Sequence, residues 1–308
     1  MMGKPPRKRR RPMSRAARQE AIEGVLFALP LLIGLLAFTA YPVIRSFVIS
    51  FARYEIFSPP QFIGVQNYVD LFHDPLFWQS LKVTTLYSIL SVPLGLVSGL
   101  AVALLMNQKV RGITVFRTIY YLPAVVSGVA VSLLWIWIFN PDFGLAKVAM
   151  RGLGLPPQPW LNDPKTALPS LVFMSLWGVG GGMVIYLAGL QGVPAHLYES
   201  ARLDGANTVQ QFRHVTLPML TPVIFYNLIM GIIGSFQVFT QAFVMTSGGP
   251  ANATLFYVLY LFRQAFAYYH MGYASAMAWI LFAIILALTL LVFRSSAAWV
   301  YYEGERKG

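Results

Sequence analysis

Long apolar stretches alternate with shorter polar segments along the chain, and six of the apolar stretches are long enough to cross a membrane. A spanning helix needs about 20 consecutive, mostly apolar residues to cross a hydrocarbon core about 30 Å thick. The six stretches run over Gly24–Ser50, Leu81–Met106, Val115–Phe139, Leu168–Leu190, Leu217–Met245 and Ala274–Phe293. The pattern therefore predicts an all-α membrane protein with six transmembrane helices.

These stretches also divide the chain into regions. A basic tail at 1–23 precedes the first transmembrane helix at 24–50, an external loop covers 51–80, a core with the other five helices covers 81–294, and a second tail covers 295–308. A basic start followed by apolar residues is also the pattern of a cleaved signal sequence. The first apolar stretch is too long, and begins too far after the basic run, for a typical cleaved signal. We therefore interpret it as a signal anchor.

Composition supports the membrane assignment and narrows the chemistry. Hydrophobic residues make up 57% of the 308 positions, charged residues make up 11%, and the mean hydropathy is +0.61. Soluble domains contain about 25% charged residues. The chain has no cysteine, and its four histidines show no paired ligand spacing. The sequence therefore predicts neither a metal site nor a catalytic thiol.

The distribution of lysine and arginine predicts the orientation. Of 23 basic residues, eight lie in the N-terminal tail, three at 109–117 around the start of the third apolar stretch, two between the fourth and fifth, and three at the C-terminal end. If each apolar stretch crosses the membrane once, these 16 lie on one side and the other seven on the opposite side. Cytoplasmic loops carry the excess of positive charge. Both termini are thus predicted to be cytoplasmic. The basic run at 4–11 is interpreted as an anchor attracted to anionic membrane lipid rather than as a nucleic-acid site.

The position of the acidic residues bears on the energy source. All eleven lie outside the six apolar stretches. Carriers driven by protons or sodium commonly keep ionisable groups at mid-membrane, where such groups are costly. The sequence also has no G-x-x-x-x-G-K-[ST] phosphate-binding loop. If the chain transports a solute, we expect a partner to supply the energy.

The polar segment at 191–216 predicts two short helices that meet at a corner. Pro194 suits a first helical position, Gly205 suits the residue just after a helix, and Asn207 with Gln210 makes a capping box. A plain amphipathic connecting helix with a glycine cap would explain each of these residues singly.

The ordered combination in this segment resembles a known family. Glu199-x-Ala201-x-x-Asp204-Gly205-Ala206, followed by Leu217-Pro218, is similar to the cytoplasmic coupling loop of ATP-binding-cassette (ABC) importer permeases. Ser200 stands where alanine is common in that loop. The resemblance implies the type I ABC importer permease fold. It also implies contact with an ATPase subunit through Glu199, Ser200, Ala201, Asp204, Gly205, Ala206, Leu217 and Pro218.

Three looser blocks narrow the resemblance to the carbohydrate-uptake (maltose/glycerol-phosphate-type) family, and to the first of its two permeases. They lie at 62–78, 116–145 and 246–276. The resemblance implies a bacterial plasma (inner) membrane location, a second homologous permease, an ABC ATPase dimer, an extracytoplasmic solute-binding protein and a saccharide substrate. It implies no catalytic residue and no cofactor in this chain, because the partner ATPase uses the ATP and Mg.

Polar and aromatic groups that interrupt the apolar helices are candidates for the substrate pathway. Gln237 and Gln241 are four residues apart, so they would share one helical face. A structural role, in which buried amides bond a neighbouring helix, is the alternative. The candidates are Tyr226, Asn227, Ser235, Gln237, Thr240, Gln241, Ser275 and Trp279.

Other functions stay open on the sequence alone. Glycerol phosphate or another polar solute is possible for the same importer class, although a phosphate would favour basic residues within the spans, which hold almost none. A self-sufficient secondary carrier would need no ATPase. A membrane-embedded enzyme would need convergent histidine and acidic residues, and no loop contains them.

Overall fold

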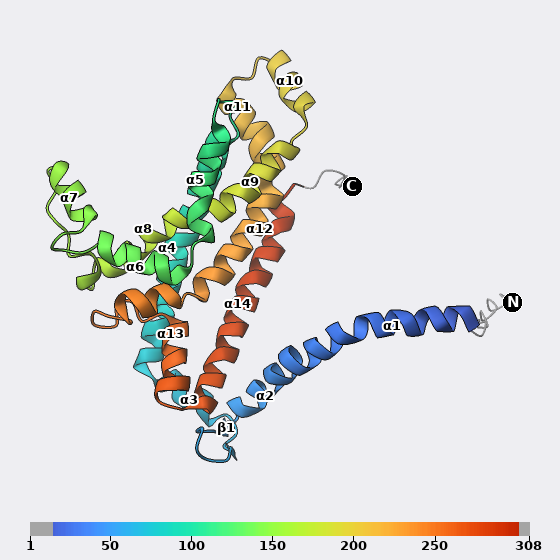
Figure 1. Cartoon of the computed structure of the whole chain (residues 1–308), viewed down its shortest axis with the longest axis vertical. Coiled ribbons are helices and arrows are strands. Elements are labelled where there is room, and N and C mark those ends of the chain that lie inside the picture. The colour runs from blue at the N-terminus through green and yellow to red at the C-terminus, as the bar shows by residue number, and fades with distance from the viewer. Residues whose placement is uncertain (1–14, 302–308) are drawn as a thin grey trace.

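In the computed structural model, which describes residues 15–301, the chain is an elongated assembly of helices (Figure 1). Four helices are long and apolar enough to span a membrane: Arg18–Ser50, Pro75–Met106, Thr208–Phe236 and Met271–Trp299. Two further pairs qualify only together, because each is bent: Ile113–Val125 with Gly128–Ile138 by 101°, and Ala167–Gly178 with Gly180–Gly192 by 44°. The all-helical prediction is confirmed, with four to six candidate spans.

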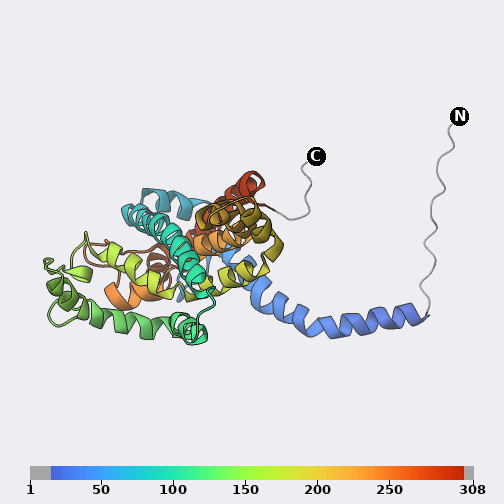
Figure 2. The same ribbon diagram turned by 90° about the horizontal axis from the view of Figure 1, so that it is seen from above.

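The first candidate span stands apart from the other helices. It consists of α1 (Arg15–Leu35), a π-helical segment η1 (Leu36–Ala40) and α2 (Tyr41–Ser50). Only α2 packs on the body, against α14 (Met271–Trp299), while α1 extends away from it (Figures 1 and 2). None of the most apolar window of this span is buried within the chain. The basic residues predicted to anchor the tail at 4–11 lie outside the described residues.

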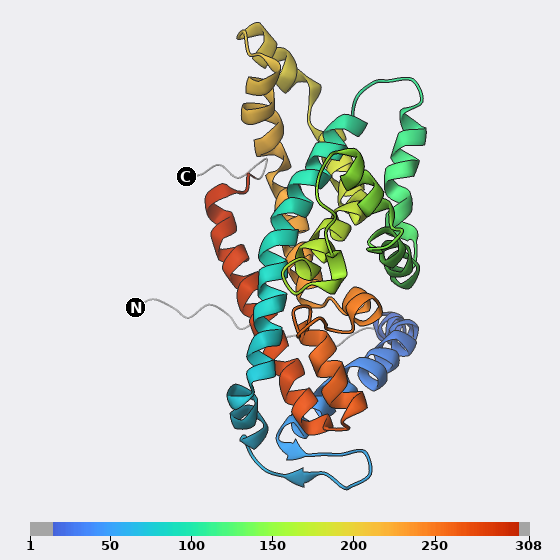
Figure 3. The same ribbon diagram turned by 90° about the vertical axis from the view of Figure 1, so that its left-hand side faces the viewer.

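The body is organised around α4 (Pro75–Met106), which runs along its length (Figure 3). α4 packs against α9 (Gly180–Gly192) and α12 (Leu217–Phe236). The main buried core forms where α4 meets α13 (Tyr257–Phe262) and α14, around the fully buried Phe77, Phe256 and Tyr257. Buried apolar side chains in this core hold the N-terminal ends of α4 and α14 together.

The two bends have identifiable local causes. α5 (Ile113–Val125) ends at Val126, which is extended, and α6 (Gly128–Ile138) begins after Ser127, which is also non-helical. The second break falls at a 3-10 turn, η3 (Leu176–Gly178), between α8 (Ala167–Ser175) and α9. There, a Cβ atom on Gly180 would lie 2.2 Å from the carbonyl oxygen of Tyr120. Glycine is therefore required for the close approach of α9 to α5.

The fifth span differs from the predicted range of 217–245. It begins earlier, because α11 (Thr208–Gln211), the π-helical η4 (Phe212–Thr216) and α12 form one continuous helix. It ends at Phe236, and the chain turns before another π-helical segment, η5 (Ala242–Thr246). The predicted range was too long because it included Val238 and Phe239, which are apolar but do not belong to the spanning helix. Both side chains pack against the main core.

Short elements connect the long helices. At one end, β1 (Ala52–Arg53) pairs antiparallel with β2 (Gln61–Phe62), and α3 (Gln66–His73) follows. α7 (Leu145–Gly152) and the 3-10 turn η2 (Trp160–Asn162) lie between α6 and α8, and the π-helical η6 (Arg263–Ala267) joins α13 to the start of α14. α10 (Ala195–Leu203) lies at the opposite end of the long axis from α3 and the strands (Figure 1).

Replacing Gly272 with alanine should destabilise the protein, because Gly272 is where α14 meets β1. A Cβ atom there would lie 2.0 Å from the carbonyl oxygen of Ala52, a backbone atom that cannot simply rotate away. Overpacking of this kind costs about 1–3 kcal/mol. We expect a lower thermal unfolding midpoint for the purified chain in detergent. Gly34→Ala is the control, since nothing lies within 4 Å of its Cβ position, and a midpoint equal to that of Gly272→Ala would contradict the packing argument.

Candidate functional sites

The first candidate site is the predicted corner at 191–216, which we call the elbow. α10 ends in a Schellman motif. The Gly205 N–H donates to the carbonyl of Arg202 at 3.0 Å, and the Ala206 N–H donates to that of Ala201 at 2.9 Å. Gly205 has a φ of +81°, which glycine adopts without strain. The predicted glycine cap is confirmed.

The second half of the elbow is also capped as predicted. The Gln210 N–H donates to Asn207 Oδ1 at 2.9 Å, and the Asn207 N–H donates to Gln210 Oε1 at 2.8 Å. This is a complete capping box at the start of α11. One detail was wrong: Pro194 precedes α10 as its N-cap, because its ψ of 131° is extended rather than helical.

The elbow presents small and acidic residues to solvent around a shallow recess. The recess has a volume of about 320 Å³ and is lined by Ala201, Asp204, Gly205, Ala206, Gln210, His214 and Val215. Glu199 and Ser200 are exposed on α10. Leu203, at the end of α10, is 90% exposed. The sequence reasoning did not include Leu203, whose apolarity within a polar helix was the available clue.

Leu217 and Pro218 lie within the continuous helix rather than on the elbow surface, and both are half-buried. The π-turn just before them lets the Leu217 N–H donate to the carbonyl of Phe212. Proline has no N–H to donate, so a locally altered bonding pattern allows the helix to continue through it. Tyr198 and Thr216, whose hydroxyl groups are 3.0 Å apart, tie α10 to this helix.

The second candidate site is a cavity of about 500 Å³ between α4, α9 and α12. Three of the predicted pathway residues, Asn227, Ser235 and Gln241, line it. The Ser235 hydroxyl is 2.7 Å from that of Ser88. Four further polar lining residues were not predicted from the sequence: Tyr87, Ser91, Ser175 and Tyr186. Hydroxyl groups within otherwise apolar stretches were the clue to them, but polarity alone does not show which face of a helix points inward.

The remaining predicted pathway residues do not line this cavity. Gln237 is exposed and caps α12, so it does not share a helical face with Gln241, and that expectation was wrong because the helix ends at Phe236. Thr240 lies beside α6, with its Cγ2 atom 3.6 Å from the Cβ position of Gly128. Tyr226 and Ser275 lie on α12 and α14 away from the cavity lining.

Trp279 has a structural contact instead. Its indole N–H donates to Ser46 Oγ at 3.2 Å, and its ring packs edge-on against Phe47 at 4.8 Å. The tryptophan therefore joins α14 to the first candidate span.

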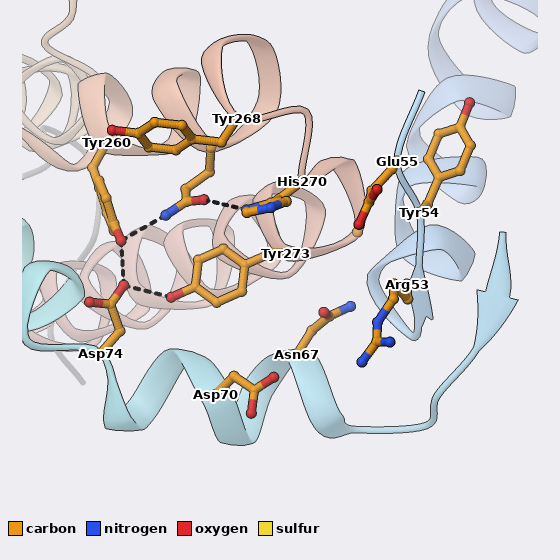
Figure 4. A pocket seen from close by; sticks show the side chains of 12 residues that line it. Arg53, Tyr54, Glu55, Asn67, Asp70, Asp74, Tyr260, Tyr268, His270 and Tyr273 are labelled. Atoms are coloured by element: carbon orange, nitrogen blue, oxygen red, sulfur yellow. Dashed lines mark hydrogen bonds between the residues drawn. The ribbon is translucent and has the colours of Figure 1, made fainter. Parts of the chain in front are cut away.

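The third candidate site is a recess of about 470 Å³ at the end of the molecule opposite the elbow (Figure 4), which we call the external recess after the predicted external loop at 51–80 that contributes to it. Its floor is a hydrogen-bonded network centred on Asp74. Asp74 Oδ1 accepts from the Leu76 N–H at 2.8 Å, and Oδ2 accepts from the hydroxyls of Tyr260 and Tyr273. Gln264 then donates to the Tyr260 hydroxyl at 2.7 Å. Asp74 thus caps α4 and ties it to α13 and α14.

The network continues to the rim of the external recess. His270 Nδ1 lies 3.1 Å from Gln264 Oε1, and His270 bridges to Glu55 through the backbone. Burial, together with the hydrogen bond to Asp74, raises the pKa of the Tyr260 hydroxyl far above its ordinary value. Tyr260 therefore remains a protonated donor to Asp74 at physiological pH.

A second set of contacts joins the first span to the same place. Asn67 is buried, and its Nδ2 donates to the carbonyls of Ser50 and Ala52 at 2.8 and 3.0 Å. The Gly272 N–H donates to the Tyr54 carbonyl at 3.2 Å. Two of the blocks that carried the family resemblance, 62–78 and 246–276, therefore meet at the external recess. Nothing in the local sequence pattern indicated that they would.

Within residues 15–301, no group of three or more histidine, aspartate or glutamate side chains is placed to hold a metal ion.

Comparisons with known proteins agree on one family. Residues 91–300 match the family described as a binding-protein-dependent transport system inner membrane component. The chain is 42% identical over 299 residues to the probable ABC transporter permease protein YesP of Bacillus subtilis, covering 96% of each chain. It is 35% identical over 290 residues to the arabinooligosaccharides transport system permease protein AraP of Bacillus subtilis, covering 91% of this chain and 89% of AraP.

A solved structure has the same fold. The crystal structure of a bacterial alginate ABC transporter, in complex with an alginate pentasaccharide-bound periplasmic protein, contains a chain that aligns with a TM-score of 0.81 at 25% identity. The alignment covers 92% of this chain and 97% of that chain.

Proposed function

Because the chain belongs to the family of binding-protein-dependent transport system inner membrane components, we propose that it is one of two permease subunits of an ABC importer that carries a saccharide into the cell. The elbow is the observation that carries this proposal. It combines an exposed leucine, two acidic residues and a rigid glycine corner at one end of a membrane protein. Such a surface offers a partner protein one apolar side chain and two carboxylates in a defined arrangement.

The elbow would transmit movement of the ATPase to the membrane helices. Small residues at Ala201, Gly205 and Ala206 allow close approach of another backbone, and Glu199 and Asp204 offer charge-assisted hydrogen bonds. The continuous helix from Thr208 to Phe236 links the elbow directly to the cavity. When two ATPase subunits close on ATP and Mg, a pull on the elbow would therefore tilt this helix and change access to the cavity.

The proposed topology has six spans with both termini in the cytoplasm. Each bent helix pair counts as one span, and the excess of lysine and arginine lies on the side of the termini and the elbow. An even number of spans places both termini on one side. The elbow then faces the cytoplasm, and the β-strands, α3 and the external recess face outward (Figure 1).

The cavity supports a saccharide as the substrate. No charged side chain of residues 15–301 lines it, whereas amides, hydroxyls and tyrosines do. Hydroxyl groups of a sugar can exchange hydrogen bonds with such groups, and a phosphate would leave its charge without a basic partner. AraP and the alginate transporter, which resemble this chain, are named for oligosaccharide and polysaccharide transport.

Reconstitution tests the proposal. The chain would be purified from its native membranes together with the proteins that accompany it, which we expect to be a second permease, an ATPase dimer and an extracytoplasmic binding protein. In proteoliposomes, the complex should hydrolyse ATP faster when binding protein and its saccharide are present, and it should accumulate that saccharide. Uptake by this chain without an ATPase would contradict the proposal and favour a secondary carrier.

A further inference from the structure

We propose that the external recess accepts a lysine or arginine side chain of the solute-binding protein. The inference rests on the proposed function, because it needs a binding protein that docks on the external face. It assigns a role to a group of residues that lies at the opposite end of the molecule from the elbow (Figures 1 and 4).

The charge of the external recess favours a cation. Three carboxylates line it, from Glu55, Asp70 and Asp74, against one guanidinium, from Arg53. With His270 neutral, the formal charge of the lining is therefore −2. Asp74 is occupied by three hydrogen bonds within the protein. The carboxylates available to an incoming group are those of Glu55 and Asp70, both of which are exposed.

The two available carboxylates come from different segments and face the same space. Glu55 follows β1, and Asp70 lies on α3 (Figure 4). One oxygen of Asp70 accepts from Gln66 Nε2 at 2.7 Å, which fixes the carboxylate and leaves its other oxygen available. A lysine ammonium or an arginine guanidinium that enters the recess could donate to either carboxylate, and such charge-assisted bonds are stronger than neutral ones.

The walls of the external recess are aromatic. Four tyrosines line it, at positions 54, 260, 268 and 273, and Tyr268 is 55% exposed. The face of a tyrosine ring attracts a cation, and the ring also covers the aliphatic part of a lysine or arginine side chain. An acidic rim with aromatic walls therefore matches both parts of a long basic side chain.

The floor of the external recess is already ordered. The network from Asp74 through Tyr260 and Gln264 to His270 joins α3–α4 to α13 and α14, and Asn67 fixes the segment that carries Glu55. A preformed site loses little conformational freedom when it is filled. A neutral saccharide would gain from the tyrosines but would have no need of the excess of carboxylates, so we favour a basic side chain as the occupant.

The test uses the reconstituted complex and the binding protein that stimulates the wild-type complex. The double variant Glu55→Gln, Asp70→Asn removes two charges with little change of shape at exposed positions. We expect the concentration of binding protein that gives half-maximal ATPase stimulation to rise about tenfold at low salt, with an unchanged maximal rate. The difference should disappear in about 1 M NaCl, where the screening length is about 3 Å.

A second double variant tests whether the effect is specific to the external recess or comes from the net charge of the whole external face. Asp142→Asn, Asp163→Asn removes the same number of charges from the segment between α6 and α8, where Asp142 is exposed and Asp163 is half-buried. This variant should bind like the wild type. An equal loss in both double variants would overturn the inference, and so would a half-maximal concentration that stays unchanged in Glu55→Gln, Asp70→Asn.

Cross-linking identifies the occupant directly. A carbodiimide joins a carboxylate to a lysine amine in contact with it. It should therefore link Glu55 or Asp70 to a lysine of the binding protein. If the partner residue is an arginine, replacing the arginines of the binding protein with lysine one at a time should produce the link. If the external recess instead held free saccharide, the double variant would raise the half-maximal saccharide concentration at saturating binding protein, and the inference would be wrong. Failure of every binding protein to stimulate the wild-type complex would contradict the proposed function as well, whereas a stimulated wild type with an unaffected variant overturns this inference alone.

Discussion

Replacing Gly205 with aspartate should abolish saccharide uptake and substrate-stimulated ATP hydrolysis while the chain remains inserted in the membrane. Gly205 has a φ of +81°, and nothing lies within 4 Å of its Cβ position. Aspartate is one of the few residues that tolerate this backbone region, so α10 should keep its cap. The new carboxylate would project from the elbow next to Asp204, into the surface that we propose the ATPase covers.

The expected size of the effect follows from burying a charge that has no partner. Such a group costs about 3–5 kcal/mol when it is enclosed in an interface, which corresponds to a loss of coupling of more than about 100-fold. Uptake would be measured in proteoliposomes with the complete complex, and ATPase activity would be measured with and without binding protein and saccharide.

Gly154→Asp is the matched control for this substitution. Gly154 also has a positive φ, of +71°, and open space around its Cβ position, but it lies in the segment between α7 and η2. The same residue change in the same backbone region should leave transport within about twofold of the wild type, because surface substitutions usually change stability by less than about 0.5 kcal/mol. Wild-type coupling in Gly205→Asp would show that the elbow does not contact the ATPase.

The elbow could be predicted from the sequence because its structure is local. The Schellman motif and the capping box involve residues three to five positions apart, so each was visible as a short pattern around Gly205 and Asn207. The only error, at Pro194, is a shift of one residue at a helix start, where caps and first helical positions are hard to separate.

The long helices could be predicted only in part. Apolar length showed where most spans lie, but it could not show that the fifth helix stops at Phe236, because residues that enter the protein core are as apolar as residues that face lipid. The sharp bend between α5 and α6 was also missed. A run of apolar residues does not show the angle between two consecutive helices, because packing against other helices sets that angle.

The external recess could not be predicted at all from local pattern. Its central bonds join Asp74 to Tyr260 and Tyr273, which are 186 and 199 positions away in the sequence. Each residue has an ordinary local explanation: Asp74 caps a helix, and the tyrosines lie near helix ends. Only the packing of α13 and α14 against α4 brings them together, and that packing depends on side-chain shape across the whole core.

The last prediction separates the two glutamines that the sequence treated as a pair. Gln241 lines the cavity, while Gln237 is exposed at the end of α12. If saccharide passes through the cavity, Gln241→Leu removes an amide that can bond sugar hydroxyls, whereas Gln237→Leu removes one that does not line the cavity. A lost hydrogen bond of this kind costs about 1–3 kcal/mol. Since about 1.4 kcal/mol is a tenfold change, we expect transport efficiency to fall about 5- to 150-fold in Gln241→Leu.

Gln237→Leu is the matched control, since it makes the same change four residues away and should stay within about twofold of the wild type. Initial rates of saccharide uptake, measured over a range of concentrations at saturating binding protein, would give the efficiency of each variant. Asn227→Leu should behave like Gln241→Leu, because Asn227 lines the same cavity and its Nδ2 already donates to the Val223 carbonyl at 2.9 Å, which leaves Oδ1 for a ligand. Equal losses in the Gln237 and Gln241 variants would mean that the substrate does not follow the cavity, since only a route outside it would expose the substrate to both amides alike.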